Sequence, residues 1–199
     1  ALYQAPEARP RGLLADPELR VPLRRALGAI FHRLRWLLRV GWRADPMVTT
    51  DLVLVLVHAC ATLFMTGLIW FVQVVHYPLK AAVGRGSFMT YQAQHVRRTG
   101  WVVGPPMIIE AVTAAALALL PPPGVSYGVA LAGLCLLIVV WASTALFSVP
   151  AHGALARGFA PEVHRRLVRT NWIRTLGWSA RSVLAFWLLL DGVHGVAQV

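Results

Sequence analysis

The chain has 199 residues, 57% of them hydrophobic, and its mean hydropathy is +0.61. This composition is typical of a membrane protein, and its long apolar segments leave no room for a second, soluble enzymatic domain. The net charge is +11, but the cations flank apolar segments, so we expect anionic lipid headgroups and no nucleic acid as partners.

The first 45 residues precede the apolar part of the chain. Residues 1–15 carry two prolines and two arginines, and we expect a disordered lead there. Asp16-Pro17 is a helix-start signal, after which leucines recur every three or four positions with arginines on the other side. We therefore predict a basic amphipathic helix over 16–45 that lies in the membrane interface, with packing against a partner subunit as the alternative.

Four apolar stretches are long enough to cross a bilayer, which takes about 20 residues. They cover residues 51–75, 101–120, 125–147 and 172–190. The sequence predicts an all-α, polytopic membrane domain of four transmembrane helices over 46–199. We expect it in a bacterial inner (cytoplasmic) membrane.

Prolines predict where these helices begin and end. We expect a long loop over 77–100 with a short surface helix after Ser87. We expect the second helix to start at Pro105-Pro106, which leaves residues 101–104 partly unwound in the membrane. Pro150 is expected to bend or end the third helix, and Pro161-Glu162 to begin the fourth.

The membrane domain looks like two copies of one helical hairpin, at about 50–121 and 124–191. Pro78 and Trp101 are 23 positions apart, and Pro150 and Trp172 are 22 apart, with arginines and a histidine between them in both copies. Nine residues beyond each tryptophan lie Glu110 and Arg181, which have opposite charge. A pseudo-two-fold arrangement of 2+2 helices would let these residues form a buried ion pair. That pair is either a clamp between helices or part of a proton relay or anion site.

The fourth helix carries a polar stripe that runs from the loop into the membrane. Asn171, Arg174, Trp178 and Arg181 fall on one face at helical spacing, and Arg174 has no obvious acidic partner. A stripe of this kind faces water or charge instead of lipid, so we interpret these four residues as a candidate ligand or anion site.

Histidines at the same side of the membrane are candidate metal ligands. His76 and His152 each follow a span, and His95 lies between spans, so their imidazoles could hold haem iron or a metal ion. The alternative is that they are interfacial or structural, because no metal-binding motif accompanies them. Cys60 and Cys135 lie inside spans and are expected to act as small apolar residues.

Two signals for membrane orientation conflict. Eight basic residues flank the two predicted loops against three near the other side, which places the loops in the cytoplasm. The basic amphipathic helix also favours the cytoplasmic leaflet, yet it lies on the opposite side. We expect cytoplasmic loops.

Three functions remain open, because the sequence contains no recognisable catalytic motif. The first is an accessory or structural subunit of a larger membrane complex, with other membrane subunits as partners. The second is a haem- or metal-bearing membrane oxidoreductase. The third is a lipid- or anion-binding membrane protein, with bound lipid as the expected cofactor.

Overall fold

The structure is a computed structural model that describes residue 28 and residues 46–197. The predicted lead (1–15) and amphipathic helix (16–45) lie outside these residues, apart from Gly28, which is helical. In the described part of the chain every regular element is a helix, as predicted.

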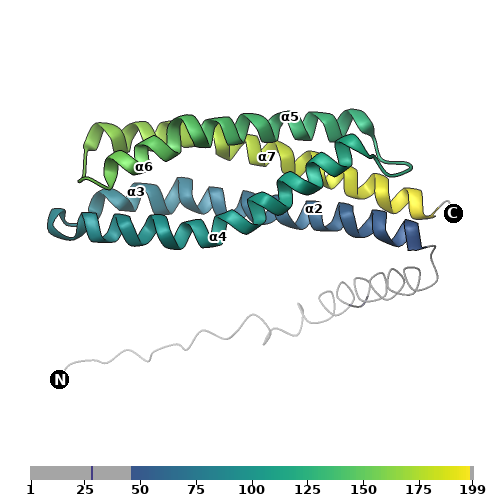
Figure 1. The fold of residues 1–199 in the computed structure, drawn as a ribbon, viewed down its shortest axis with the longest axis horizontal. Helices are drawn as coiled ribbons and strands as arrows, with labels where there is room; N and C mark the ends of the chain where they lie inside the picture. Colours follow the sequence, from purple (N-terminus) through teal and green to yellow (C-terminus); the bar gives the residue numbers. More distant parts are fainter. Residues whose placement is uncertain (1–27, 29–45, 198–199) are drawn as a thin grey trace, which may run out of the picture. The chain divides into compact units, whose positions relative to one another are not determined.

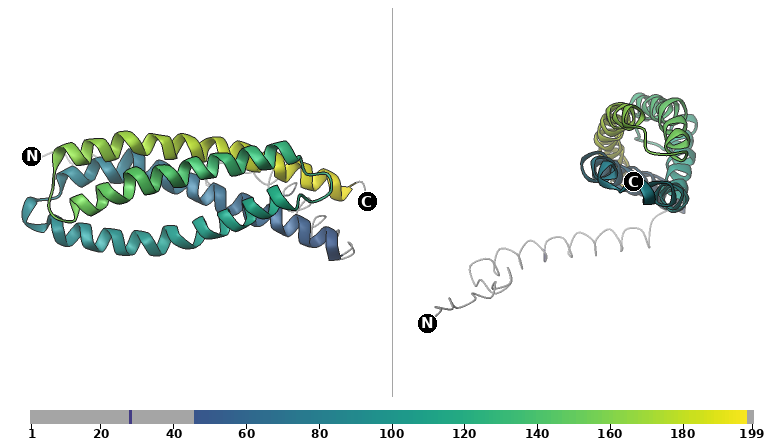
Figure 2. Two further views of the ribbon diagram at one scale, coloured as in Figure 1. Left: turned by 45° about the horizontal axis from the view of Figure 1, so that its top comes forward. Right: turned by 90° about the vertical axis from the view of Figure 1, so that its left-hand side faces the viewer.

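The helices follow one another along the chain in nine segments of the described range. They are α2 (Pro46–Phe71), the π-helix η2 (Val72–His76), α3 (Tyr77–Leu79), the 3-10 helix η3 (Lys80–Ala82), α4 (Arg85–Leu119), α5 (Tyr127–Ser143), the π-helix η4 (Thr144–Ser148), α6 (Val149–Leu155) and α7 (Pro161–Ala197). They form four rods that are long and apolar enough to cross a membrane. The rods lie lengthwise beside one another as a bundle (Figures 1 and 2).

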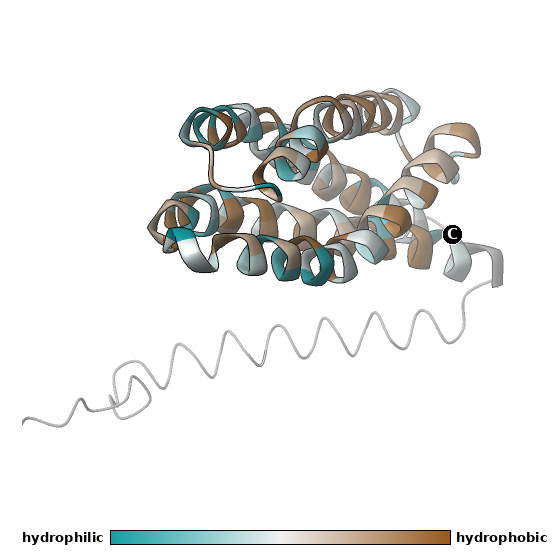
Figure 3. Cartoon of the chain, turned by 60° about the vertical axis from the view of Figure 1, so that its left-hand side comes forward, coloured by the Kyte–Doolittle hydropathy of each residue, from teal (hydrophilic) through white to brown (hydrophobic). Residues whose placement is uncertain are grey.

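The rods are longer than the predicted spans. The rod from Arg85 to Leu119 has 35 residues, or about 52 Å at 1.5 Å per residue, against a hydrocarbon thickness of about 30 Å. The helices must therefore extend beyond the apolar layer. Hydrophilic residues gather toward the end that carries the α3–α4 and α6–α7 connections (Figure 3). We call this end of the bundle the polar end.

The prediction of a long loop over 77–100 is wrong, because α3 and η3 continue the first rod and α4 already begins at Arg85. Pro150 was expected to bend or end the third helix, and it does not end it, since α6 carries the rod on to Leu155. The prediction for Pro161 is confirmed: it is the first residue of α7, where its missing N–H has no helical partner to lose.

Both prolines that follow a span are accommodated by a π-helix. Proline lacks an N–H and clashes with the carbonyl four residues earlier, so a wider turn before it relieves the helix. The two π-helices begin at Val72 and Thr144, which is the same 72-residue offset that separates Pro78 from Pro150. Such turns occur often at functional sites.

Pro105-Pro106 does not start a helix, contrary to our prediction. Both prolines lie inside α4, which is continuous from Arg85 to Leu119. The two missing N–H groups deprive only a local turn of its hydrogen bonds, and packed helices in membranes tolerate such a defect. The ribbon of α4 changes direction along its course, as expected for internal proline (Figure 1). No unwound entrance exists at 101–104.

Three apolar layers alternate with polar ones inside the bundle. The layer around Val55 and Leu188 lies toward the chain's C-terminus, the layer around Met65 and Trp178 lies in the middle, and the layer around Phe88 lies at the polar end. Polar side chains are buried in the two intervals between these layers, and the candidate sites are found there.

Candidate functional site

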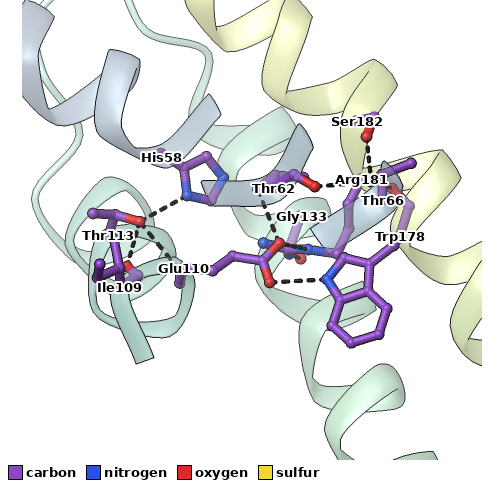
Figure 4. Close-up of polar contacts among 10 residues, drawn as sticks. All are labelled: His58, Thr62, Thr66, Ile109, Glu110, Thr113, Gly133, Trp178, Arg181 and Ser182. Carbon is purple, nitrogen blue, oxygen red and sulfur yellow. Dashed lines mark hydrogen bonds and ion pairs between the residues drawn. The ribbon is translucent and has the colours of Figure 1, made fainter. Parts of the chain in front are cut away.

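The first polar interval contains a buried network around one carboxylate, which we call the central network. Its members are Thr62 of α2, Glu110 and Thr113 of α4, Gly133 of α5, and Trp178 and Arg181 of α7, with His58 of α2 beside them (Figure 4). Sequence analysis singled out Glu110, Arg181 and Trp178, and the structure brings these three together.

Three side chains donate hydrogen bonds to the carboxylate of Glu110. Arg181 Nε and Thr62 Oγ1 both donate to Oε1 at 2.9 Å, and Trp178 Nε1 donates to Oε2 at 2.9 Å. Glu110 is 0% and Arg181 1% exposed. Breaking a buried pair of this kind by removing one partner typically costs about 3–5 kcal/mol. The pair therefore ties α2, α4 and α7 together.

Arg181 is only partly satisfied by this pairing. Its Nη1 donates to the backbone carbonyl of Gly133 on α5, which adds a fourth helix to the network. Its Nη2 is buried and has no hydrogen-bond partner in the described part of the chain.

The second polar interval lies at the polar end, and we call its side chains the end cluster. They are Gln73, His76, Tyr77 and Lys80 of the first rod, Gln92, His95 and Thr99 of α4, Ser148 and His152 of the third rod, and His164, Asn171 and Arg174 of α7. Lys80, Gln92 and Asn171 are each 0% exposed. All four rods therefore contribute buried polar groups to one interval.

A directed chain of hydrogen bonds runs through one half of the end cluster. Lys80 Nζ donates to Gln92 Oε1 at 2.9 Å, which fixes the orientation of that amide. Gln92 Nε2 is then the donor to His152 Nδ1 at 3.1 Å, so His152 carries its proton on Nε2. His152 Nε2 donates to Tyr77 Oη at 2.9 Å. The Tyr77 hydroxyl proton is therefore left to point at a further acceptor.

The other half of the end cluster is centred on Arg174. Its Nη1 donates to Ser148 Oγ at 3.2 Å and to Asn171 Oδ1 at 3.1 Å, and Nε is buried without a partner. The guanidinium carbon lies 5.3 Å from the ring centroid of Trp178, which is a cation–π contact with a residue of the central network. Asn171 in turn donates to Gln73 Oε1 at 2.7 Å.

The end cluster has positive charge, and the described residues provide no acid to neutralise it. The described residues contain four acids, of which Glu162 pairs with the exposed Arg165 and Glu110 with Arg181. Asp191 accepts from the backbone of Ser126, and Asp51 lies near the start of α2. Among the described residues, no ion pair includes the buried Lys80 or Arg174.

The three histidines proposed as metal ligands lie in the end cluster, but they pair with one another and with neighbours. His76 Nε2 and His95 Nδ1 are 3.0 Å apart with their rings stacked, and the His95 and His152 ring centroids are 5.3 Å apart. Both nitrogens of His152 are engaged in the chain described above. Among the described residues, no group of three or more His, Cys, Asp or Glu is placed to hold a metal ion. The metal hypothesis stays a prediction from the sequence.

Sequence reasoning missed several central members of the end cluster. Lys80, Gln92 and Tyr77 were not singled out, because they fell in the segment expected to be a loop. One signal was present: Lys80 is the only lysine beside 18 arginines, and a repeat offset of 72 residues aligns it with His152. His58 behaves as a structural histidine and bonds Thr113 on the neighbouring α4 at 2.9 Å.

The chain matches no protein-family model, no curated protein and no solved structure. The described part of the chain contains two chemically different groups of buried polar side chains. The central network is a neutral ion pair whose carboxylate accepts three hydrogen bonds. The end cluster is a buried group of donors with excess positive charge.

Proposed function

We propose that this chain is a small integral membrane protein that binds an anionic ligand at its polar end. The observation that supports this most directly is the burial of Lys80 and Arg174 in a cluster without a carboxylate. An anion held there would supply the missing charge.

Arg174 supports an anion site more strongly than Lys80 does. An arginine does not lose its proton in proteins, whereas a buried lysine can become neutral. Burying a charge without a partner costs several kcal/mol, and Arg174, 7% exposed, has only neutral contacts. A ligand carboxylate or phosphate would offset this cost.

The direction of the hydrogen bonds also favours an anionic acceptor. In the series of hydrogen bonds from Lys80 to Tyr77, each group donates to the next one. The last group is the Tyr77 hydroxyl, whose proton has no acceptor among its contacts in the described residues. Arg174 Nε is a second free donor. Two free donors suit the oxygens of a carboxylate or phosphate and would repel a cation.

A basic groove lies on the outer surface of α7, on the same helix as Arg174. It is lined by Glu162, Arg165, Arg166, Arg169, Thr170 and Ile173. From Arg169 to Arg174 the helix rises about 7.5 Å. A phospholipid headgroup could reach this groove from the membrane and a soluble organic anion could reach it from water, so both sources fit the proposal.

The proposal is tested by comparing Arg174→Gln with Arg98→Gln, an exposed arginine of α4 at the same end. Native mass spectrometry of the detergent-purified variants would report retained phospholipid. Thermal unfolding with millimolar phosphate or succinate would report soluble anions. We expect Arg174→Gln to lose the retained lipid or the anion-induced stabilisation, and Arg98→Gln to keep it. Equal behaviour of Arg174→Gln and the parent chain would overturn the proposal.

A second candidate is the accessory or structural subunit of a larger membrane complex. The central network favours it, because a carboxylate that accepts three hydrogen bonds and clamps helices is suited to structure and not to proton transfer. This role requires stable partners, so copurification of stoichiometric membrane subunits after mild solubilisation would support it. A chain that is monomeric and alone under those conditions would count against it.

The haem- or metal-bearing oxidoreductase is the remaining alternative. His76, His95 and His152 lie in one cluster, but their nitrogens are bonded to neighbours. An absorption spectrum and elemental analysis of the purified protein decide this alternative. A Soret band or stoichiometric metal would support it, and their absence would remove it.

We also propose that the domain arose from a duplicated hairpin in a bacterial inner membrane. The equal offset of the two π-helices and of Pro78 and Pro150 supports the duplication. The pairing of Glu110 with Arg181, nine residues beyond Trp101 and Trp172, agrees with a pseudo-two-fold relation.

A further inference from the structure

The basic groove on the outer surface of α7 carries excess positive charge. Its charged lining residues are one acid and three exposed arginines, namely Glu162, Arg165, Arg166 and Arg169. Glu162 already pairs with Arg165, and neither ion pair of the described residues includes Arg166 or Arg169. With a volume of about 430 Å³, the groove has the size of a small-molecule site. It can therefore receive an anionic group from outside the chain.

Arg166 also contacts the neighbouring rod. Its guanidinium carbon lies 5.9 Å from the ring centroid of Phe147 in η4, which is a cation–π contact. This contact places the side chain at the boundary between two rods without neutralising its charge. A guanidinium binds the oxygens of a phosphate with two N–H groups at once, so an arginine pair is well suited to a phosphate group.

The same face of α7 becomes apolar one turn beyond Arg169. At 100° per residue, the basic residues 165, 166 and 169 and the apolar residues Ile173, Leu176 and Val183 fall within about 100° of arc. The three apolar side chains are exposed. From Ile173 to Val183 the helix rises about 15 Å, which is half of the hydrocarbon thickness of about 30 Å. The apolar part of this face therefore matches the depth of one membrane leaflet.

A tryptophan lies where the face changes from basic to apolar. Trp172 is exposed, and its ring centroid lies 5.7 Å from that of Trp70 on the first rod, edge to face. Tryptophan prefers the membrane–water interface, at the level of the lipid headgroups. Arg169 and Arg166 precede Trp172 by about 5 and 9 Å along the helix axis, toward the polar end. Their charges are therefore at the depth of lipid phosphates.

We propose that this groove binds one anionic phospholipid. Arg166 and Arg169 hold its phosphate, and an acyl chain lies along the apolar part of the face. A soluble anion would contact the arginines alone, whereas a lipid uses the whole face. Headgroups that also carry an ammonium find no free acid in the groove, because Glu162 pairs with Arg165. The site is therefore selective for a headgroup with net negative charge.

The test compares two double variants that remove the same charge from the same end of the bundle. Arg166→Gln/Arg169→Gln alters the groove, and Arg97→Gln/Arg98→Gln alters two exposed arginines of α4. Delipidated protein is titrated in detergent with dioleoylphosphatidylglycerol or dioleoylphosphatidylcholine, and bound lipid is counted by native mass spectrometry. We expect the groove variant to bind phosphatidylglycerol about tenfold more weakly, or worse, since it loses two arginine–phosphate contacts. The α4 variant should bind it like the parent chain.

Two results would overturn the site. Equal weakening by both double variants would show that binding follows overall charge. Equal binding of the two lipids by the parent chain would show that the headgroup charge is not recognised. Glu162→Gln gives a change in the opposite direction, because it releases Arg165 from its ion pair. Phosphatidylglycerol should then bind more tightly, and weaker binding would contradict the assignment.

Arg174→Gln separates the groove from the anion site proposed in the end cluster. Arg174 is buried inside the bundle, so its replacement should leave the titration with phosphatidylglycerol unchanged. Loss of this binding in Arg174→Gln, with normal binding by the groove variant, would place the lipid in the end cluster and refute the groove. The groove variant should keep any stabilisation by phosphate or succinate. If the parent chain shows no such stabilisation and retains no lipid at Arg174, only the end-cluster proposal fails.

Discussion

Trp178 belongs to both polar interiors of the bundle. Its indole N–H donates to Glu110, its ring face receives Arg174, and its edges pack with Met65 and Val140. The ring is 0% exposed. One side chain therefore separates the neutral ion pair from the positively charged end cluster, and its hydrogen bond and its packing can be tested separately.

Trp178→Phe keeps an aromatic ring and removes the N–H that Glu110 accepts. A hydrogen bond to a charged group contributes about 1.5–3 kcal/mol, and the smaller ring also leaves a void, so we expect a loss of at least that size. The measurement is the free energy of unfolding in mixed detergent micelles.

The matched control is Trp70→Phe. Trp70 is an exposed tryptophan whose Nε1 donates to Ser179 Oγ at 3.0 Å, so the same atoms are removed from a neutral, exposed bond. Its loss should be about 1 kcal/mol or less. Equal losses for the two variants would show that the Glu110 carboxylate gains nothing from the indole.

Residues of the central network were more accessible to sequence reasoning than those of the end cluster. Glu110 and Arg181 stand out as charges within apolar spans, and charges there need partners. Lys80 and Gln92 lie outside the predicted spans, where a buried polar side chain and an exposed one look alike in the sequence. Only the packing of four rods beyond the apolar spans buries them.

At the scale of the helix, α5 and α7 pack closely because one residue lacks a side chain. A Cβ at Gly177 would lie 2.6 Å from Val140 Cγ2, a distance that packed carbons do not adopt. Val140 is 0% exposed and has no room to move aside. The contact therefore depends on the glycine.

Gly177→Ala should separate α5 from α7 and lower the free energy of unfolding by about 1–3 kcal/mol, as overpacking does. Val140→Ala in the same chain removes the clashing methyl group and should recover part of that loss. The control is Gly67→Ala on α2, where a Cβ meets no atom within 4 Å and alanine should be neutral or stabilising. A double variant no more stable than Gly177→Ala would exclude Val140 as the cause.

The ends of helices were predicted well where proline acts alone and poorly where packing opposes it. Pro161 begins α7 as predicted, because the first residue of a helix needs no N–H for a helical hydrogen bond. Pro150 and Pro105-Pro106 lie inside rods packed against other rods. The tertiary contacts of these rods outweigh the hydrogen bonds that proline removes from the helix. Such contacts cannot be predicted from the residues next to the proline in the sequence.

At the scale of the whole molecule, the exposed basic residues of the range 46–197 are concentrated at one end. Of the eight basic residues counted there, Lys80 is buried, which leaves seven arginines, all exposed. No Lys or Arg is found among the described residues at the opposite end of the bundle, which include the connection between α4 and α5. Arginine near short connections favours the cytoplasmic side. The polar end, with its candidate anion site, is therefore expected to face the cytoplasm.

Cysteine labelling in bacterial cells tests this orientation. Ala156→Cys places a thiol in the α6–α7 connection, and Pro121→Cys places one between α4 and α5, both at exposed positions. A membrane-impermeant maleimide should label Pro121→Cys in intact cells and Ala156→Cys only after the inner membrane is opened.

The native cysteines provide the internal control. Cys60 and Cys135 are free and exposed on the outer surface of the bundle, within the apolar spans, so lipid should shield them from the reagent in both conditions. Labelling of Ala156→Cys in intact cells would reverse the orientation. It would also place the end cluster outside the cytoplasm. The anion would then have to come from the outer leaflet or the periplasm. Phospholipid and soluble anion would in that case be compared with ligands from that side of the membrane.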